Sequence, residues 1–585
     1  MNITTFLMLG LAFAYAVMPY AVLLMLPGIT LFRNRSIYYR LFASVAGGTA
    51  LLCLSSTIIS HYGFDLYMKA HFFIFLAGLA ALLFMMVRFL RRRPAEPILP
   101  PLIPCAIVLV SLAVRLAPVL LTPDSLGGDD ARFHNILAQK ILLTRSYITD
   151  WEPFANIPIS YPIGAHVVTA FLAHTAQVPV HNVFNFLIVL AGVLTTGIIY
   201  LAAREIFHSP AQAGFSAACY ALLPFWGSLD YVRWGGLPNA MAMLFLCFIV
   251  LVLIRNMHGE WQAPALVAAI CVAAIAQVHH YTLMIAAIMF VFSFVFCQEK
   301  GLRRLLLVSG LAGAILCVPL FGIKAAKMLS TLGDSSIVAF REHPITVLGA
   351  AFEMNPGFVV LFVLALVAAR KEAWPAGGIL ALAWFVGLFL SFVLLEYVYR
   401  VATLVLSSGT DSYTCLTPSR MATDMVYPMA ILCGFLPATA LWYQYRKLIV
   451  AAFVLFALIS SMSGIKRYSG VGSDPGLQSV AAWFREKTPE NTMIVGSIPH
   501  LEYATWRETT NPPLPASESR KNKRVTWKTS ITNANDWLIW GMEHRRPVYF
   551  VFKRSDNVPR SLRIEFYNSR YIVAGKRIIT VDLTK

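Results

Sequence analysis

The sequence predicts a polytopic α-helical membrane protein that carries a small α+β domain at its C-terminal end. Of its 585 residues, 58% are hydrophobic and only 13% are charged, whereas soluble domains carry roughly 25% charged residues. Apolar runs long enough to cross a bilayer recur up to residue 464, and the chain after that point is polar with short strand-like runs. These observations place about fourteen transmembrane helices in residues 1–464 and a separate domain in residues 465–585.

The candidate spans share long apolar stretches that charged residues interrupt only rarely. They lie near 5–30, 41–60, 70–90, 102–121, 183–203, 213–228, 238–254, 262–279, 281–297, 303–323, 345–369, 376–399, 427–444 and 447–464. Basic residues gather in alternate loops, beginning with the loop after the first span, and the positive-inside rule makes those loops cytoplasmic. The loops that this alternation places outside are 122–182, 324–344 and 400–426, together with the C-terminal residues 465–585.

The formal net charge of +18 does not indicate a nucleic-acid partner. Most of the basic residues flank hydrophobic segments, where membrane topology requires them. The nine cysteines form no CxxC pair, so neither a disulfide framework nor a zinc site is predicted. The first apolar run lacks a basic segment before it, and we interpret it as a retained span of a protein of the cytoplasmic (inner) membrane.

The C-terminal residues predict a small α+β domain outside the membrane. The segment LQSVAAWFREKTPEN is typical of an amphipathic helix that ends at a proline. The runs TMIVGSI, PVYFVFK and YIVAGKRIITVDL are typical of strands. About 120 residues are enough for a domain with its own core.

The densest polar chemistry of the N-terminal half follows two glycines in the first long external loop. Asp129 and Asp130 are adjacent, and an amphipathic helix is predicted to begin near them. Asp130 and His134 are one turn apart and would share a face of that helix. The alternative is an acidic N-cap on a surface helix, but carboxylates at the mouth of a membrane domain favour a functional site.

Other polar features recur at the same predicted membrane face, and most of them carry cations. They are DYVRWGGLPN with Arg233, QVHHY with His279 and His280, the loop region with Lys324, Lys327 and Arg341, and TPSRMATD with Arg420. A carboxylate pair facing several cations suits a reaction on a lipid-linked anion. A carboxylate can take a proton from an attacking hydroxyl, and an arginine can neutralise a phosphate leaving group.

Each of these features also has a purely structural interpretation. Arg420 is able to reach the lipid–water interface with its long side chain. His279 and His280 end a predicted span and would anchor it at the interface, as Arg233 would with the neighbouring Trp234. The acidic pair therefore carries the functional interpretation, and the cations support it.

The motif DDARF, the W-x-P that follows it and the segment ISYPIGAHVVTAFLAH resemble the first external loop of the GT-C superfamily of integral-membrane glycosyltransferases. The resemblance extends over about residues 101–464, so that residues 1–100 would be additional N-terminal spans. It implies that an aspartate of the motif, Asp129, is the catalytic base. Tyr161 occupies the place of a proline-containing stretch that leads into the next helix. TPSRMATDMVYPMAILCGF is similar to a late segment of the superfamily in which an arginine, here Arg420, contacts the lipid phosphate.

The resemblance implies transfer of a sugar from a polyprenyl-phosphate-linked donor to a hydroxyl of a glycan, lipid or protein acceptor at the extracytoplasmic face, with inversion. Asp129 would take the proton of the acceptor, and Asp130 would orient the acceptor or a bound ion. Arg420, helped by Lys324, Lys327 or Arg341, would stabilise the departing phosphate. The further binding residues of the site would be His134, Tyr161, Arg233, His279 and His280. No second acidic motif stands out, so no cofactor is required and a divalent cation, Mg²⁺ or Mn²⁺, stays an alternative.

Three other functions compete with transfer. A transporter or flippase of lipid-linked sugars would place charges near the middle of its spans, where few acids occur here. A polysaccharide polymerase or ligase shares external arginines but does not need a helix led by two aspartates. A non-catalytic scaffold would work through its exported tail. The tail has NDWLIWG in place of a WWDYG motif, which argues against asparagine glycosylation.

Overall fold

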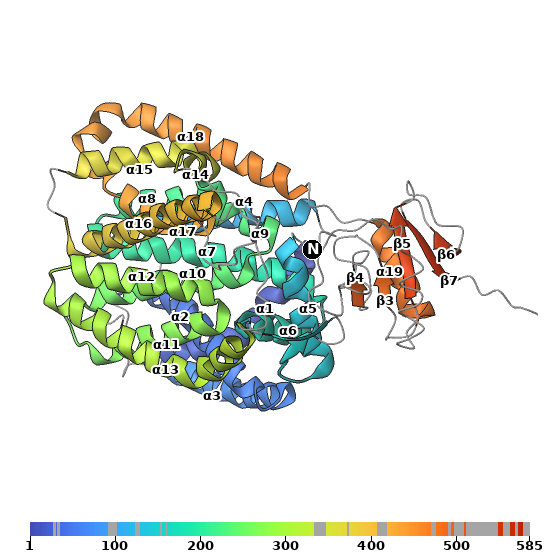
Figure 1. Cartoon of the computed structure of the whole chain (residues 1–585). Helices are drawn as coiled ribbons and strands as arrows, with labels where there is room; N and C mark the ends of the chain where they lie inside the picture. The colour runs from blue at the N-terminus through green and yellow to red at the C-terminus, as the bar shows by residue number, and fades with distance from the viewer. Residues whose placement is uncertain are drawn as a thin grey trace, which may run out of the picture.

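The structure is a computed structural model of the whole chain, and most of the chain is helical (Figure 1). It describes residues 1–26, 31, 35–91, 102–122, 129–151, 155–159, 161–332, 347–370, 374–405, 418–469, 475–488, 493–495, 508–510, 548–553, 562–567 and 571–576. Arg341, which the sequence analysis placed at the outer face, lies outside these residues. The side chains of Asp129, Lys324 and Lys327 also lie outside the description, although their backbones belong to helices.

Ten of the described helices are long and apolar enough to cross a membrane. They are α1 (Ile3–Met25), α2 (Ile37–Ser60), α3 (Phe64–Arg91), α4 (Leu102–Leu121), α7 (Val180–Phe207), α10 (Leu237–Asn256), α13 (Lys300–Leu332), α16 (Ala376–Val405), α17 (Pro418–Cys433) and α18 (Ala440–Ser469). The bent pair α14 (Val347–Met354) and α15 (Pro356–Ala369) makes eleven if it forms one span. Two shorter apolar helices are α11 (Gln262–Val278) and α12 (His280–Phe296). A polytopic helical protein is therefore confirmed, and the number of about fourteen spans stays a prediction.

Two of the predicted spans are interrupted. The run 213–228 is helical only in α8 (Pro210–Leu222), and a short π-helix, Phe225–Leu229, follows it. The run 345–369 bends by 107° at Asn355, which has a φ of 120° and precedes a proline. Proline disfavours a helical conformation in the residue before it, and asparagine tolerates a positive φ better than most residues. The Asn355 side chain then accepts a hydrogen bond from the backbone N–H of Gly357 at 2.8 Å and caps α15.

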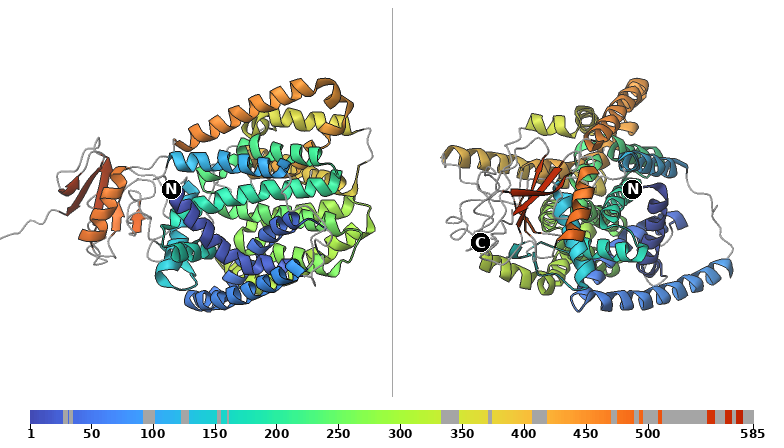
Figure 2. Two further views of the ribbon diagram at one scale, coloured as in Figure 1. Left: turned by 180° about the vertical axis from the view of Figure 1, so that it is seen from behind. Right: turned by 90° about the vertical axis from the view of Figure 1, so that its right-hand side faces the viewer.

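The helical body has a buried centre and two outer flanks. Every residue in the most apolar part of α10 is buried, and α7 is almost as deeply enclosed. In contrast, α3 and α18 expose most of their apolar residues, and they lie at opposite edges of the body (Figures 1 and 2). The apolar faces of these outer helices are the surfaces that a bilayer would cover.

The three N-terminal helices pack into this body. Phe6 and Phe13 of α1 make edge-to-face contacts with Phe186 of α7, at 5.2 and 6.3 Å between ring centroids. Before α2, Arg35 Nη2 lies 2.5 Å from Glu205 Oε2 near the end of α7. The additional spans are thus joined to the central helix α7 near both of its ends.

The C-terminal part contains one helix, α19 (Pro475–Lys487), and a five-stranded sheet of order β4-β3-β5-β7-β6. The strands are β3 (Met493–Val495), β4 (Glu508–Thr510), β5 (Val548–Lys553), β6 (Leu562–Tyr567) and β7 (Tyr571–Lys576). β3 runs parallel to β4 and β5, whereas β7 is antiparallel to β5 and β6. Trp483 of α19 packs against Tyr549 of β5, at 5.5 Å between ring centroids. The sheet lies beyond the end of the helical body where α5 (Asp129–Thr144) is found (Figures 1 and 2).

A close contact between two backbones fixes the start of α5. Gly235 ends the one-turn helix α9 (Tyr231–Trp234) with a φ of 90°, a conformation that favours glycine. A β-carbon on Gly235 would overlap the backbone nitrogen and Cα of Ala131. Because Ala131 directly follows the acidic pair, the turn between α9 and α10 sets the position of both aspartates.

We expect Gly235→Ala to destabilise the protein and displace α5. The left-handed conformation alone costs an alanine roughly 1–2 kcal/mol, and the overlap with Ala131 adds to that cost. The apparent Tm of the detergent-solubilised protein would measure the effect. Gly10→Ala is the matched control, because nothing lies within 4 Å of the β-carbon position of Gly10. Equal Tm values for the two variants would contradict the proposed contact.

Candidate active site

The predicted helix after the external glycines is present, and it begins with the acidic pair itself. α5 runs from Asp129 to Thr144, and Asp129 and Asp130 occupy its first turn. The unpaired N–H groups of a first helical turn favour negative charge. Asp130 is half-buried, and Ala131 and His134 are buried. The acids are therefore held where the helix meets the body.

Tyr161 is the centre of a cluster of rings beside α5. Its ring centroid lies 5.4 Å from that of His134, 5.9 Å from that of His166, 6.2 Å from that of His279 and 5.4 Å from that of His280. These histidines come from α5, from α6 (Gly164–Ala176) and from the break between α11 and α12. The structure thus brings together four residues that the sequence analysis placed in one site, namely His134, Tyr161, His279 and His280.

A glycine allows α6 to approach this break closely. A β-carbon on Gly164 would lie 2.7 Å from the carbonyl oxygen of Gln277 and 2.9 Å from Oγ1 of Thr57. His279 follows with extended backbone, φ −157° and ψ 106°, and separates the two short helices α11 and α12. The segment QVHHY therefore contains the break between α11 and α12, and the start of α6 packs closely against it.

Arg420 and Asp130 act on the same tyrosine from different elements. Burial raises the pKa of Tyr161, while the charge of Arg420 lowers it and the charge of Asp130 raises it. Arg420 lies in the first turn of α17, with its guanidinium carbon 5.6 Å from the ring centroid of Tyr281. The predicted phosphate-binding arginine and the acidic helix start thus share one electrostatic environment.

His134 is a neutral group in this cluster. Its Nδ1 lies 2.9 Å from Nε2 of His166, so one ring donates a hydrogen bond and the other accepts it. Burial lowers the pKa of His134 to about 3, and the nearby charge of Arg420 acts in the same direction. Because it is neutral near pH 7, His134 is suited to hydrogen bonding and unsuited to neutralising a phosphate.

Arg233 has a carboxylate partner of its own. Its Nε lies 2.5 Å from Oδ1 of Asp230, and its Nη2 lies 2.9 Å from Oδ2. Asp230 is fully buried at the start of α9, so this bidentate pair closes within the single turn of that helix. The role of Arg233 in substrate binding stays a prediction.

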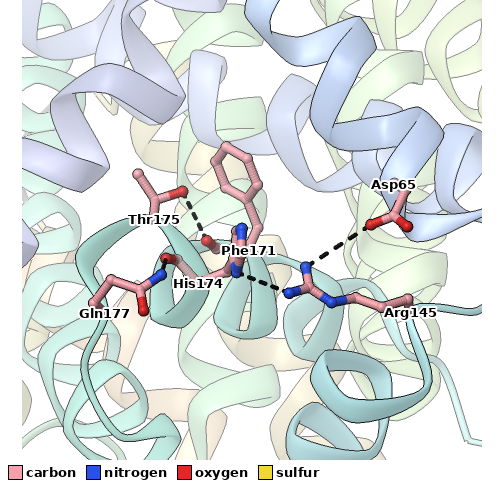
Figure 3. Close-up of polar contacts among 6 residues, drawn as sticks. All are labelled: Asp65, Arg145, Phe171, His174, Thr175 and Gln177. Atoms are coloured by element: carbon pink, nitrogen blue, oxygen red, sulfur yellow. Dashed lines mark hydrogen bonds and ion pairs between the residues drawn. The ribbon is translucent and has the colours of Figure 1, made fainter.

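The far end of α5 is held by a second set of polar contacts (Figure 3). Arg145, which has a φ of 54°, lies between Asp65 of α3 and His174 of α6. Its Nη1 is 3.8 Å from Oδ1 of Asp65, and its Nη2 is 3.3 Å from Nδ1 of His174. The backbone N–H of Phe64 also donates to the carbonyl of Arg145 at 3.2 Å. α5 is thus fixed at both ends.

Sequence reasoning missed several residues of this region. His166 stands inside the segment ISYPIGAHVVTAFLAH without being singled out, although its position two residues after Gly164 places it in the first turn of α6. Asp424 is fully buried one helical turn after Arg420. The sequence analysis placed it in the loop 400–426, whereas α17 begins at Pro418 and includes it.

The described residues contain no group of three or more His, Cys, Asp or Glu side chains with the geometry to hold a metal ion. This search does not include the side chain of Asp129. Of the acidic pair at the start of α5, the structure describes the side chain of Asp130.

Comparisons with known proteins agree on a superfamily. Residues 162–323 match the family described as dolichyl-phosphate-mannose-protein mannosyltransferase. No curated protein gives a significant match to the chain. The structure is similar to ArnT from Cupriavidus metallidurans bound to undecaprenyl phosphate, at 12% identity and a TM-score of 0.56, covering 81% of this chain and 98% of that one. It is also similar to the oligosaccharyltransferase AglB from Archaeoglobus fulgidus in complex with an inhibitory peptide and a dolichol-phosphate, at 14% identity and a TM-score of 0.53, covering 77% of this chain and 69% of that one.

The similarity to the solved structures establishes the fold. The predicted resemblance to the GT-C superfamily of membrane glycosyltransferases is confirmed by this fold together with the family match. The predicted enzyme class, a glycosyltransferase, agrees with both findings. The chain is a multi-pass membrane protein.

The lowered pKa of His134 predicts a stability that falls on acidification. Between about pH 3 and the ordinary value of 6.5, the unfolded chain binds a proton at this residue that the folded protein does not. Stability therefore rises with pH through this window and is complete above it. We expect a lower apparent Tm at about pH 5 than at about pH 7.5, and a smaller difference for His134→Asn.

His258→Asn is the control for this experiment, because the side chain of His258 is 68% exposed. If His134→Asn and His258→Asn changed the pH dependence of Tm equally, the assignment of the effect to His134 would be wrong.

Proposed function

We propose that the protein is a glycosyltransferase that moves a sugar from a polyprenyl-phosphate-linked donor to an acceptor hydroxyl at the extracytoplasmic face, with inversion. The observation that carries the proposal is the ring cluster around Tyr161, whose ring centroid lies 5.4 Å from that of His134, one helical turn after Asp130. Arg420, in the first turn of α17, has its guanidinium carbon 5.6 Å from the ring centroid of Tyr281, and the charges of Asp130 and Arg420 both act on Tyr161. The similar structures of ArnT, bound to undecaprenyl phosphate, and of AglB, in complex with a dolichol-phosphate, support a lipid phosphate in the donor.

In this mechanism the acceptor oxygen attacks the anomeric carbon of the donor sugar. The bond between that carbon and the phosphate oxygen breaks, and its electron pair leaves with the lipid phosphate. Asp129 takes the proton of the acceptor hydroxyl, and Asp130 orients the acceptor. Arg420 neutralises the charge that develops on the phosphate, with Lys324, Lys327 or Arg341 as further cations. Attack from the side opposite the leaving group inverts the anomeric configuration.

The local environment supports this division of roles. His134 and His279 are buried and Tyr161 is half-buried near Arg420, and burial strengthens the interaction between a guanidinium and a phosphate. Neutral rings next to the arginine bind sugar hydroxyls without competing for the phosphate. Asp130 and Arg420 act on this cluster from different helices, α5 and α17. A transporter or a polymerase does not require a carboxylate and an arginine at one ring cluster.

The C-terminal sheet has a proposed place in the same reaction. It lies beyond the end of the body that carries α5 (Figure 1). We assign it to the extracytoplasmic side, because basic loops alternate along the chain and put residues 465–585 outside. An acceptor that approaches the site from outside the membrane would pass this sheet.

The base assignment predicts a large effect of Asp129→Asn on transfer. The substitution preserves the shape of the side chain and removes its basicity, and loss of a general base typically lowers the rate by about 10²- to 10⁴-fold. We expect the variant to fold and to bind lipid donor, and to transfer sugar at least about a hundredfold more slowly. Asp130→Asn should cost less.

Transfer would be assayed with a panel of polyprenyl-phosphate sugars, and donor binding would be measured separately. Glu299→Gln removes a carboxylate at the predicted cytoplasmic side and serves as the control. Near-normal transfer by Asp129→Asn would show that Asp129 is not the base. Loss of both folding and donor binding would show that its role is structural.

The phosphate assignment predicts that Arg420→Ala raises the KM for the donor and lowers turnover, and that Arg420→Lys restores only part of each. A guanidinium can donate two parallel hydrogen bonds to a phosphate, whereas an ammonium acts as a point charge. Arg303→Ala is the control, because Arg303 lies over the ring of Phe294 at the start of α13, away from α17. Unchanged donor kinetics in Arg420→Ala would remove Arg420 from the site.

A further inference from the structure

A continuous chain of hydrogen bonds runs from α17 to the ring cluster. Tyr427 Oη lies 3.1 Å from Tyr231 Oη, and Nδ2 of Asn239 donates to Tyr231 Oη at 3.2 Å. Oγ1 of Thr282 donates to Oδ1 of Asn239 at 2.9 Å, and Nδ1 of His279 lies 2.7 Å from that same Oγ1. The chain therefore connects α17, α9, α10 and α12, and it ends at a residue that faces Tyr161.

All five of these residues are buried. In an apolar interior, each proton of such a chain must have one acceptor, because an unpaired polar group there costs about 1–3 kcal/mol. Consequently, once the donor and the acceptor of one hydrogen bond in the chain are known, the donor and the acceptor of the next one follow.

The amide of Asn239 sets the direction of the chain. Its nitrogen faces Tyr231, and its oxygen accepts from Thr282.

The tautomer of His279 follows from this direction. The single proton of the Thr282 hydroxyl is donated to Asn239, so the oxygen of Thr282 accepts from Nδ1–H of His279. Burial lowers the pKa of His279 well below its ordinary value, and the charges of His280 and Arg420 act in the same direction. A neutral imidazole carries one ring proton, and here that proton is on Nδ1. Nε2 is then an acceptor.

We propose that Asn239 and Thr282 are positioning residues that hold His279 as the Nδ1–H tautomer, so that Nε2 accepts a hydrogen bond from a hydroxyl of the donor sugar. This inference rests on the proposed function. A bare ring nitrogen offers no proton to a phosphate oxygen, and it pairs only with an O–H or N–H group. His279 therefore recognises the sugar part of the donor, whereas Arg420 recognises the phosphate.

The test compares Thr282→Val with Thr282→Ser and with a matched control. Valine has the shape of threonine but cannot accept from Nδ1–H, and serine restores the hydroxyl. Thr195→Val is the control, because the buried hydroxyl of Thr195 donates only to the carbonyl of Ala191 on its own helix. The first measurement is the ¹⁵N NMR signal of the histidine ring nitrogens in labelled protein, with His279→Gln used to assign the signals.

We expect an Nδ1–H signature for His279 in the wild type and in Thr282→Ser, and its loss in Thr282→Val. The second measurement is binding of bare polyprenyl phosphate and of a panel of polyprenyl-phosphate sugars. Thr282→Val should weaken the tightest-binding sugar-bearing lipid by about 3- to 10-fold, the value of one neutral hydrogen bond. Its binding of bare polyprenyl phosphate should be unchanged.

An Nε2–H signature in the wild type would overturn the inference, because the chain would then run in the opposite direction. So would equal weakening of bare and sugar-bearing lipid in Thr282→Val. If no lipid on the panel binds the wild-type protein, the proposed function fails. The ring-nitrogen signals would still decide whether Asn239 and Thr282 set the tautomer.

Discussion

The contact between Gly235 and the backbone of Ala131 is the constraint on which the site depends. It places the first turn of α5 against the turn that opens α10. The approach of Gly164 to Gln277 places α6 in the same way against the break between α11 and α12. The two helices α5 and α6 thus rest on two tightly packed turns of the helical body. The geometry of the proposed site is therefore set by packed backbone, which varies less than a surface loop would.

The site combines few charges with many neutral polar groups. Asp130 and Arg420 are the charges that reach Tyr161, while His134 and His279 are kept neutral by burial and by Arg420 itself. A cation among neutral, buried rings interacts more strongly with an incoming anion than an exposed cation does. This combination agrees with the proposed ligand, which has one anionic part and a hydroxyl-rich part.

The sequence was sufficient to predict the membrane class and the helix led by Asp129. The rings of His134, Tyr161, His279 and His280 also lie together in the structure, whereas their role in one site with Arg420 stays a prediction. Apolar run length and basic loop residues are local signals, and they encode spans and topology directly. The contacts between spans are not local. Tyr231 and Tyr427 are 196 residues apart, and Asn239 and Thr282 are 43 apart. No periodicity in one sequence pairs such positions. The bend at Asn355 was missed because the length of an apolar run says nothing about where a helix bends. The hydrogen bonds that the Asn355 side chain donates to Leu223 and Ser460 join it to residues far away in the sequence.

The burial of α10 has a consequence for how the protein is made. This helix is the most apolar of the ten described spans, although in the folded protein it is wholly enclosed, whereas the lipid-facing α18 is less apolar. Its final surroundings therefore do not account for its apolarity. A spanning helix enters the bilayer during synthesis according to its own hydrophobicity, before later helices exist to surround it. α10 precedes α11, α12, α16 and α17 in the chain, so the face that they cover must be stable in lipid while they are still being synthesised. The sequence of α10 must therefore be compatible with two environments in succession, first with lipid and then with the protein interior.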